Sequence, residues 1–175
     1  MRPHTLVAGI GNIFLSDDAF GVETANRLAA RPDLPEGVRV EDYGIRGIHL
    51  AYELLEGYDA LVLIDAVPMG EAPGTLAVIE PQLVQGPSTG SDPDSHPVDA
   101  HTMSPDVVLA TLARLGGSVG RVVIVGCQPA DLREGMGLTP AVQDAVDAAV
   151  DLCLEVVADV ALSHANAQPA ERGSH

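Results

Sequence analysis

Hydrophobic residues follow two alternating patterns along the chain: short continuous runs, and longer stretches in which they recur every three or four positions. The continuous runs predict β-strands over 5–10, 38–43, 60–64, 75–79 and 121–127. Three of them (5–10, 60–64 and 121–127) are almost entirely apolar, which is typical of strands buried on both faces of a parallel sheet. We expect Asp65 to terminate the third strand.

The helical spacing predicts helices over 19–29, 48–55 and 105–115 and a last helix that begins after Thr139-Pro140. Ser104-Pro105 provides a capping residue followed by proline in the first helical position, and Thr139-Pro140 repeats this device. The last helix carries a single apolar stripe, formed by Val142, Val146, Ala149, Cys153, Val156 and Val160.

Strands alternate with helices throughout, so we predict a three-layer α/β fold with a mostly parallel, twisted sheet flanked by helices. The chain has 175 residues, which suits one domain. We expect this domain to cover residues 1–162 and residues 163–175 to form a disordered tail. Residues 81–100 are rich in Pro, Gly, Ser and Asp, which predicts a long loop.

The charge of the chain restricts its partners. The formal net charge is −16, and every basic residue apart from histidine is arginine. Such a chain repels phosphate backbones and anionic lipid surfaces, so neither nucleic acid nor membrane is an expected partner. The start of the sequence has no signal-peptide layout, and no apolar run is long enough to span a bilayer. We therefore expect a soluble, cytoplasmic protein.

The two cysteines, Cys127 and Cys153, are far apart and form no Cys-x-x-Cys pair. This spacing predicts neither a disulfide framework nor a zinc knuckle. Cys127 ends an apolar strand and Cys153 lies on the apolar stripe of the last helix. We expect both to be buried core thiols.

Ligands of open α/β sheets bind beyond the carboxyl ends of the strands, and acidic residues follow two of the predicted strands there. Gly9 and Gly11 let the chain turn tightly after the first strand, and Asp17 and Asp18 follow at the start of the next helix. Acids in a first helical turn also complement the helix dipole, so a purely structural role stays open. Asp65 follows a buried strand, where its charge must be paired, hydrated or metal-bound unless it only ends the strand.

A histidine completes a possible metal site. His101 immediately precedes the helix-start signal at Ser104, and His96 in the same segment competes with it. Asp18, Asp65 and His101 would give two carboxylates and one imidazole, a set that suits a divalent ion such as zinc or nickel with one open coordination position. The spacing does not choose between these metals, and a solvent-exposed histidine is the plainer interpretation of His101 alone.

Several common active-site motifs are missing: the sequence has no His-Glu-x-x-His, no Gly-x-Ser-x-Gly and no Walker A loop. A dinucleotide fingerprint would need glycine where Phe14 stands. Glu41 and Asp42, at the end of the second strand, could still imitate the acid that binds a ribose. A nucleotide-binding enzyme therefore stays as a weak alternative.

Several segments together resemble the hydrogenase maturation protease family, whose members process the large subunit of nickel–iron hydrogenases. The N-terminal run at 9–22 resembles the family's first signature, and His101 before a capped helix resembles its histidine. The other matching segments, in order, are 42–44 with Gly47, 61–67, 125–129 and 137–140. The similarity spans residues 5–160.

The resemblance implies a fold of the phosphorylase/hydrolase-like kind and a peptide hydrolase that removes the C-terminal extension of the hydrogenase large-subunit precursor after nickel insertion. By motif position, the family's metal-binding and catalytic residues correspond to Asp18, Asp65 and His101. The nickel that they bind is expected to belong to the substrate, so no permanent cofactor is implied. Asp17 is a candidate supporting acid. A non-proteolytic nickel-binding chaperone that uses the same three ligands stays as the principal alternative.

Overall fold

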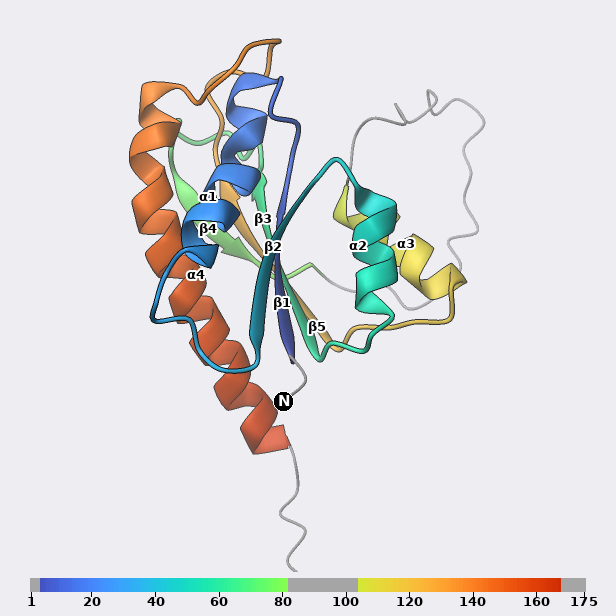
Figure 1. Ribbon diagram of the computed structural model, residues 1–175. Coiled ribbons are helices and arrows are strands. Elements are labelled where there is room, and N and C mark those ends of the chain that lie inside the picture. The colour runs from blue at the N-terminus through green and yellow to red at the C-terminus, as the bar shows by residue number, and fades with distance from the viewer. Residues whose placement is uncertain (1–3, 82–103, 168–175) are drawn as a thin grey trace, which may run out of the picture.

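The computed structural model describes residues 4–81 and 104–167 of the chain (Figure 1). Five strands form one sheet in the order β2-β1-β3-β5-β4. The strands are β1 (Thr5–Ile10), β2 (Val38–Gly44), β3 (Ala60–Ala66), β4 (Leu76–Ile79) and β5 (Arg121–Cys127). The helices are the 3-10 helix η1 (Ser16–Ala19), α1 (Phe20–Ala29), α2 (Gly47–Leu54), α3 (Pro105–Arg114) and α4 (Pro140–Ala167).

The sheet is mostly parallel, as predicted. β1 pairs in parallel with β2 and β3, and β3 pairs in parallel with β5, while β4 joins the edge antiparallel to β5. β1 and β3 are the central strands, and almost all of their residues are buried. Long apolar runs therefore mark these strands because both faces of the sheet are covered.

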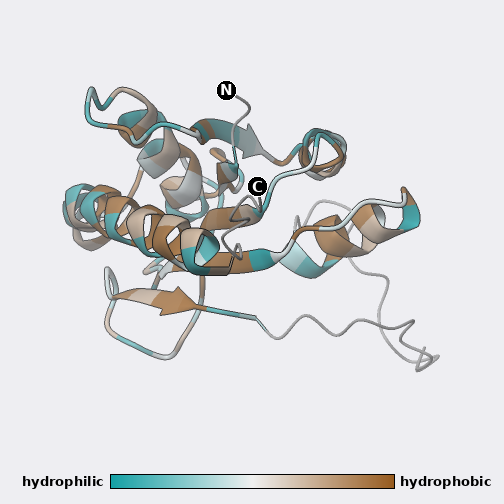
Figure 2. Ribbon diagram, turned by 90° about the horizontal axis from the view of Figure 1, so that it is seen from below, coloured by the Kyte–Doolittle hydropathy of each residue, from teal (hydrophilic) through white to brown (hydrophobic). Residues whose placement is uncertain are grey.

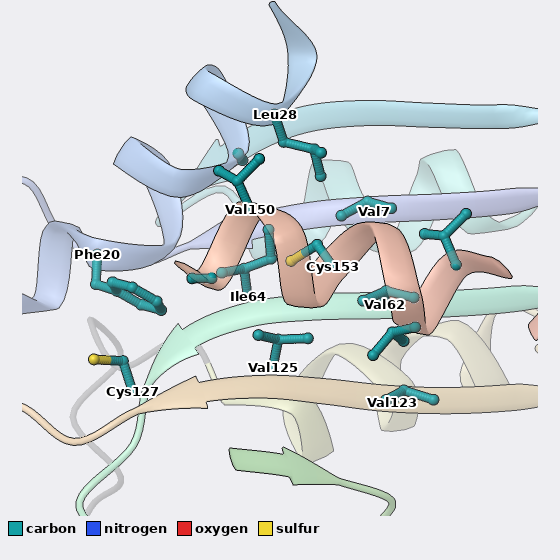
Figure 3. Close-up of a cluster of buried hydrophobic side chains, with 14 of the residues drawn as sticks. Val7, Phe20, Leu28, Val62, Ile64, Val123, Val125, Cys127, Val150 and Cys153 are labelled. Carbon is teal, nitrogen blue, oxygen red and sulfur yellow. The ribbon is translucent and has the colours of Figure 1, made fainter. Parts of the chain in front are cut away.

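The helices form two layers, with α1 and α4 on one face of the sheet and α2 and α3 on the other (Figure 1). Each face has its own core. Val7, Val62 and Val125 point toward Phe20 and Cys153 in the core beneath α1 and α4 (Figure 3). In Figure 2, hydrophilic and hydrophobic residues alternate around α4, as expected for a helix with one buried face.

Two glycines bring α1 unusually close to the sheet. A Cβ atom on Gly21 would lie 2.1 Å from the carbonyl oxygen of Ile64 and 2.2 Å from that of Ile10. A Cβ atom on Gly9 would lie 2.3 Å from the carbonyl oxygen of Gly21. The start of α1 therefore rests directly on the backbone of β1 and β3, and residues just before α1 are placed next to the ends of these strands.

Most predicted elements are confirmed to within a residue or two, with two differences. Asp65 does not end the third strand: it lies inside β3 and pairs with Gly126 of β5, because the ladder continues to Ala66. The boundary at residue 162 is too early, since α4 continues to Ala167 with Val160 still buried against the core. Residues 168–175 lie outside the described residues, as does most of the predicted loop at 81–100.

The predictions for the cysteines are confirmed. Cys127 and Cys153 are both free and fully buried. Burial raises the pKa of the Cys127 thiol to about 11 and that of Cys153 to about 12. Across residues 4–81 and 104–167, no helix is long and apolar enough to cross a lipid bilayer.

Candidate active site

The carboxyl ends of β1, β3 and β5 meet at one edge of the sheet, because these strands run parallel. Three segments converge there: residues 11–18 after β1, the end of β3, and residues 128–139 after β5 (Figure 1). This is the edge at which open α/β sheets bind their ligands. The structure brings Asp18 and Asp65 to this edge, as the sequence predicted.

Asp18 is held by a tight loop after β1. The backbone N–H of Asn12 donates a hydrogen bond of 2.7 Å to the Asp18 carboxylate. Gly11 makes this approach possible, because its φ is +134° and a Cβ atom there would lie 1.8 Å from the carbonyl oxygen of Asp18. The Asn12 side chain in turn accepts from the N–H of Phe14 at 2.9 Å. The loop that begins at Gly11 therefore orients the carboxylate of Asp18.

Asp65 lies half-buried near the end of β3. Burial raises the pKa of its carboxyl well above the ordinary value, and the nearby Asp18 raises it further, although a hydrogen bond from the N–H of Ala66 opposes the shift. Among the described residues, neither Asp18 nor Asp65 forms an ion pair with a basic side chain. Two close carboxylates without a basic partner in the described part of the chain favour a bound cation.

Asp17 has a different role from its neighbour. It is fully buried, and its carboxylate accepts from the backbone N–H groups of Thr139 at 2.7 Å, Ala130 at 2.8 Å and Asp131 at 3.0 Å. The Thr139 hydroxyl also donates to it. Burial alone would raise the pKa of Asp17, but these hydrogen bonds outweigh burial and lower it. Asp17 fastens η1 to the segment between β5 and α4.

Sequence reasoning missed these contacts. Asp17 was considered a supporting acid, and Thr139 a capping residue, yet the Thr139 hydroxyl donates to Asp17. A second connection was also missed: the Gln128 side-chain oxygen accepts from the N–H groups of Met69 and Glu71 and so fixes the segment after β3. The only sequence signal was the presence of an acid, a threonine and a glutamine beside strand ends.

The predicted third ligand, His101, lies outside the described residues, as does its competitor His96. Among residues 4–81 and 104–167, no group of three His, Cys, Asp or Glu side chains is arranged to hold a metal ion. The described part of the site therefore consists of two oxygen donors, Asp18 and Asp65. Carboxylate oxygens suit a divalent cation.

Glu41 and Asp42, the two acids that could have bound a ribose, are each paired with an arginine. Arg39 donates to Glu41 at 2.8 Å, and Arg46 lies 3.6 Å from the Asp42 carboxylate. A phosphate would bind at the start of α1, but Asp18 lies two residues before α1 and is close enough to Asp65 to raise its pKa. Two carboxylates would repel a phosphate there, so this geometry argues against a nucleotide.

The sequence of the chain matches the family model described as hydrogenase maturation protease, HycI, over residues 22–156. The chain belongs to the hydrogenase maturation protease family. Members of this family are endopeptidases, so the chain is a peptide hydrolase, and the resemblance seen in its motifs is confirmed.

Individual relatives agree with this assignment. The chain is 33% identical over 169 residues to the hydrogenase expression/formation protein HupD of Bradyrhizobium diazoefficiens, covering 95% of this chain and 85% of that protein. It is 31% identical over 150 residues to the hydrogenase 2 maturation protease of Escherichia coli, covering 85% and 87%.

A solved structure shows the same fold. The hydrogenase maturating endopeptidase HybD from E. coli superposes with a TM-score of 0.72 at 30% sequence identity, covering 91% of this chain and 93% of that one. The α/β architecture predicted from the sequence is thus that of the family's known members. Family membership also decides against a nucleotide-binding enzyme and against a role limited to nickel binding.

Proposed function

We propose that this endopeptidase removes the C-terminal extension of a nickel-loaded hydrogenase large-subunit precursor, and that Asp18 and Asp65 bind the nickel of that precursor. The observation that carries the proposal is the pair of carboxylates at the sheet edge. They lie close enough for Asp18 to raise the pKa of Asp65, and they have no basic partner among the described residues. A divalent cation would remove this repulsion.

We propose that the nickel belongs to the substrate, as the resemblance to the family implies, and is not a permanent cofactor of the enzyme. The described residues offer two carboxylates as its ligands, Asp18 and Asp65. His101 is proposed as the third ligand because it matches the histidine of the family's motif. Ligands from both the enzyme and the precursor would then surround the nickel, which would let the enzyme distinguish nickel-loaded from nickel-free precursor.

The site would then cleave the amide bond closest to the bound nickel. Either the nickel or a carboxylate of the pair activates a water molecule for attack on the carbonyl carbon, and the leaving amine takes up a proton. Asp17 is not proposed to take part in this step, since its carboxylate is fully occupied by hydrogen bonds. Its contribution is to hold η1, and with it Asp18, in place.

The proposed setting of the reaction is the cytoplasm, and the proposed partner is the precursor alone. The net charge of −16 disfavours binding to nucleic acid or to anionic lipid. No other cofactor is required by the proposed chemistry.

Intact-mass analysis of the precursor tests this proposal. Nickel-loaded and nickel-free precursors are incubated with the enzyme, and each is also incubated alone. We expect one defined C-terminal peptide to be lost, only from the nickel-loaded sample and only with enzyme. Equal cleavage of both precursors would contradict the role given to nickel. Absence of cleavage of the nickel-loaded precursor would contradict the substrate proposed here.

A further inference from the structure

Four large apolar side chains are exposed beside the candidate active site, on two segments that are distant in sequence. We call them the apolar rim: Ile13, Phe14, Leu132 and Met136. Phe14 is 62% exposed and Met136 is 71% exposed. Both segments lie at the end of the molecule where β1, β3 and β5 finish (Figure 1). Clusters of this kind on a soluble protein mark interaction surfaces.

The rim is built on a rigid backbone. Residue Leu15 forms a parallel bridge with Gly135. The N–H of Gly135 donates to the carbonyl of Phe14 at 2.9 Å, and the N–H of Ser16 donates to the carbonyl of Gly135 at 2.9 Å. The Ser16 hydroxyl donates to the carbonyl of Arg133 at 2.8 Å. Phe14 directly precedes the bridged Leu15, and Met136 directly follows the bridged Gly135, so these hydrogen bonds fix the backbone at both residues.

The first of these segments continues directly into Asp18 of the candidate site. Ser16 adopts a φ of +51°, uncommon for a residue with a side chain, and lies between the rim and Asp18. Phe14 is connected to Asp18 through Asn12 by two hydrogen bonds. Because Phe14 and Asp18 are four residues apart, their Cα atoms lie within about 14 Å, a distance that about four extended substrate residues span.

We infer that the apolar rim binds apolar side chains of the precursor within a few residues of the bond that is cleaved. This inference rests on the proposed function. Proximity supports it, since Phe14 lies within reach of a peptide of about four residues that starts at Asp18. Charge supports it as well: two copies of a chain with a net charge of −16 repel each other, which disfavours self-association through this surface. Aromatic and methionine side chains are also enriched in protein interfaces.

Kinetics with the nickel-loaded precursor test the inference, and Leu162 provides a matched control. Leu162 is 66% exposed, comparable to Phe14, but it lies near the far end of α4. We expect the double variant Phe14→Ala/Met136→Ala to raise KM at least about tenfold with kcat changed less than about twofold, as for loss of interface anchors. Leu162→Ala should match wild type, and Phe14→Leu/Met136→Leu should restore most of the affinity.

The outcomes separate this inference from the proposed function. If wild-type enzyme does not cleave the precursor, the proposed function is wrong. If wild type cleaves and the double alanine variant has a wild-type KM, the rim does not bind substrate. Sedimentation equilibrium provides the remaining test. A wild-type dimer that the double alanine variant converts to monomer would identify the rim as a contact between two copies and would overturn the inference.

Discussion

The two ends of β3 each carry one aspartate, in opposite surroundings. Asp59 precedes the strand at its amino end. Its side chain is 40% exposed, accepts from His4 at 3.0 Å and lies 3.5 Å from a nitrogen of His164. Asp65 lies near the carboxyl end, where its half-buried carboxyl is close to another carboxylate, that of Asp18.

This difference shows where to look for chemistry. The carboxylate of Asp59 contacts solvent and the His4 ring, so its surroundings are satisfied without a ligand. The surroundings of Asp65 oppose ionisation, which the raised pKa records. A protein keeps such an arrangement at a cost to its stability, and groups of this kind concentrate at functional sites. The residue type is the same at both ends, and only the three-dimensional context distinguishes them.

The largest expected effect is on cleavage. Asp65→Asn should lower the rate of peptide release by about 100-fold or more, the range typical of removing a group that acts in the transition state or positions the metal. Asp59→Asn at the other end of β3 should stay within about twofold of wild type. Single-turnover cleavage of nickel-loaded precursor, followed by intact mass, measures both. Equal losses of cleavage rate in Asp65→Asn and Asp59→Asn would contradict a specific role for the carboxyl end of β3.

The second effect concerns the close contact of Gly21 in α1 with the backbone at the carboxyl ends of β1 and β3. Gly21→Ala should lower the free energy of unfolding by about 3 kcal/mol or more, since its Cβ would meet backbone oxygens of β1 and β3 that cannot move aside. Gly116→Ala is the control: it has a φ of +82° but open space around it, so only about 1 kcal/mol of backbone strain is expected. Urea denaturation measures both values, and similar losses would show that the contact is unimportant.

The third effect concerns Asp17, whose buried carboxylate is satisfied by hydrogen bonds. Asp17→Asn should lower the free energy of unfolding by about 2 kcal/mol, because an amide cannot accept from all the buried N–H donors that face it. Asp65→Asn should leave stability unchanged or increase it, since it removes a charge that burial and Asp18 disfavour. The free energy of unfolding is thus expected to fall for Asp17→Asn but not for Asp65→Asn, although both acids lie at the same edge of the sheet. Destabilisation by both variants would contradict this account.

The smallest effect is a pH dependence. The pKa of Asp17 is lower in the folded protein than the ordinary value of 3.8, so the unfolded chain binds its proton more tightly. The stability that Asp17 contributes is therefore complete above about pH 4 and is lost as the pH falls through the lower folded pKa. The difference in unfolding free energy between wild type and Asp17→Asn should shrink over that acidic range. A difference that stays constant with pH would mean that the charge of Asp17 is irrelevant.

The fold was largely predictable from the sequence, because strands buried on both faces leave continuous apolar runs and capped helices leave Ser-Pro and Thr-Pro signals. The strand order and the length of β3 were not, since pairing partners such as Asp65 and Gly126 lie far apart in the chain. The end of α4 at Ala167 was not predicted, because residues 163–167 include no large apolar side chain.

The candidate site was predictable only in part. Asp18 and Asp65 follow apolar strands, and parallel strands place such residues at one edge. The division of roles between Asp17 and Asp18 was not predictable, because the partners of Asp17 are 113 to 122 positions away. The role of His101 stays a prediction, since it lies outside the described residues.

The central claim is that Asp18 and Asp65 act as one unit on the nickel of the precursor. The most direct test compares the single-turnover cleavage rates of Asp18→Asn, Asp65→Asn and the double variant. If the two carboxylates bind the same ion, either single substitution already abolishes productive binding of the nickel. The double variant should then be about as slow as either single variant. If the two losses multiply, so that two 100-fold defects become about 10,000-fold, the carboxylates act independently and the claim is wrong.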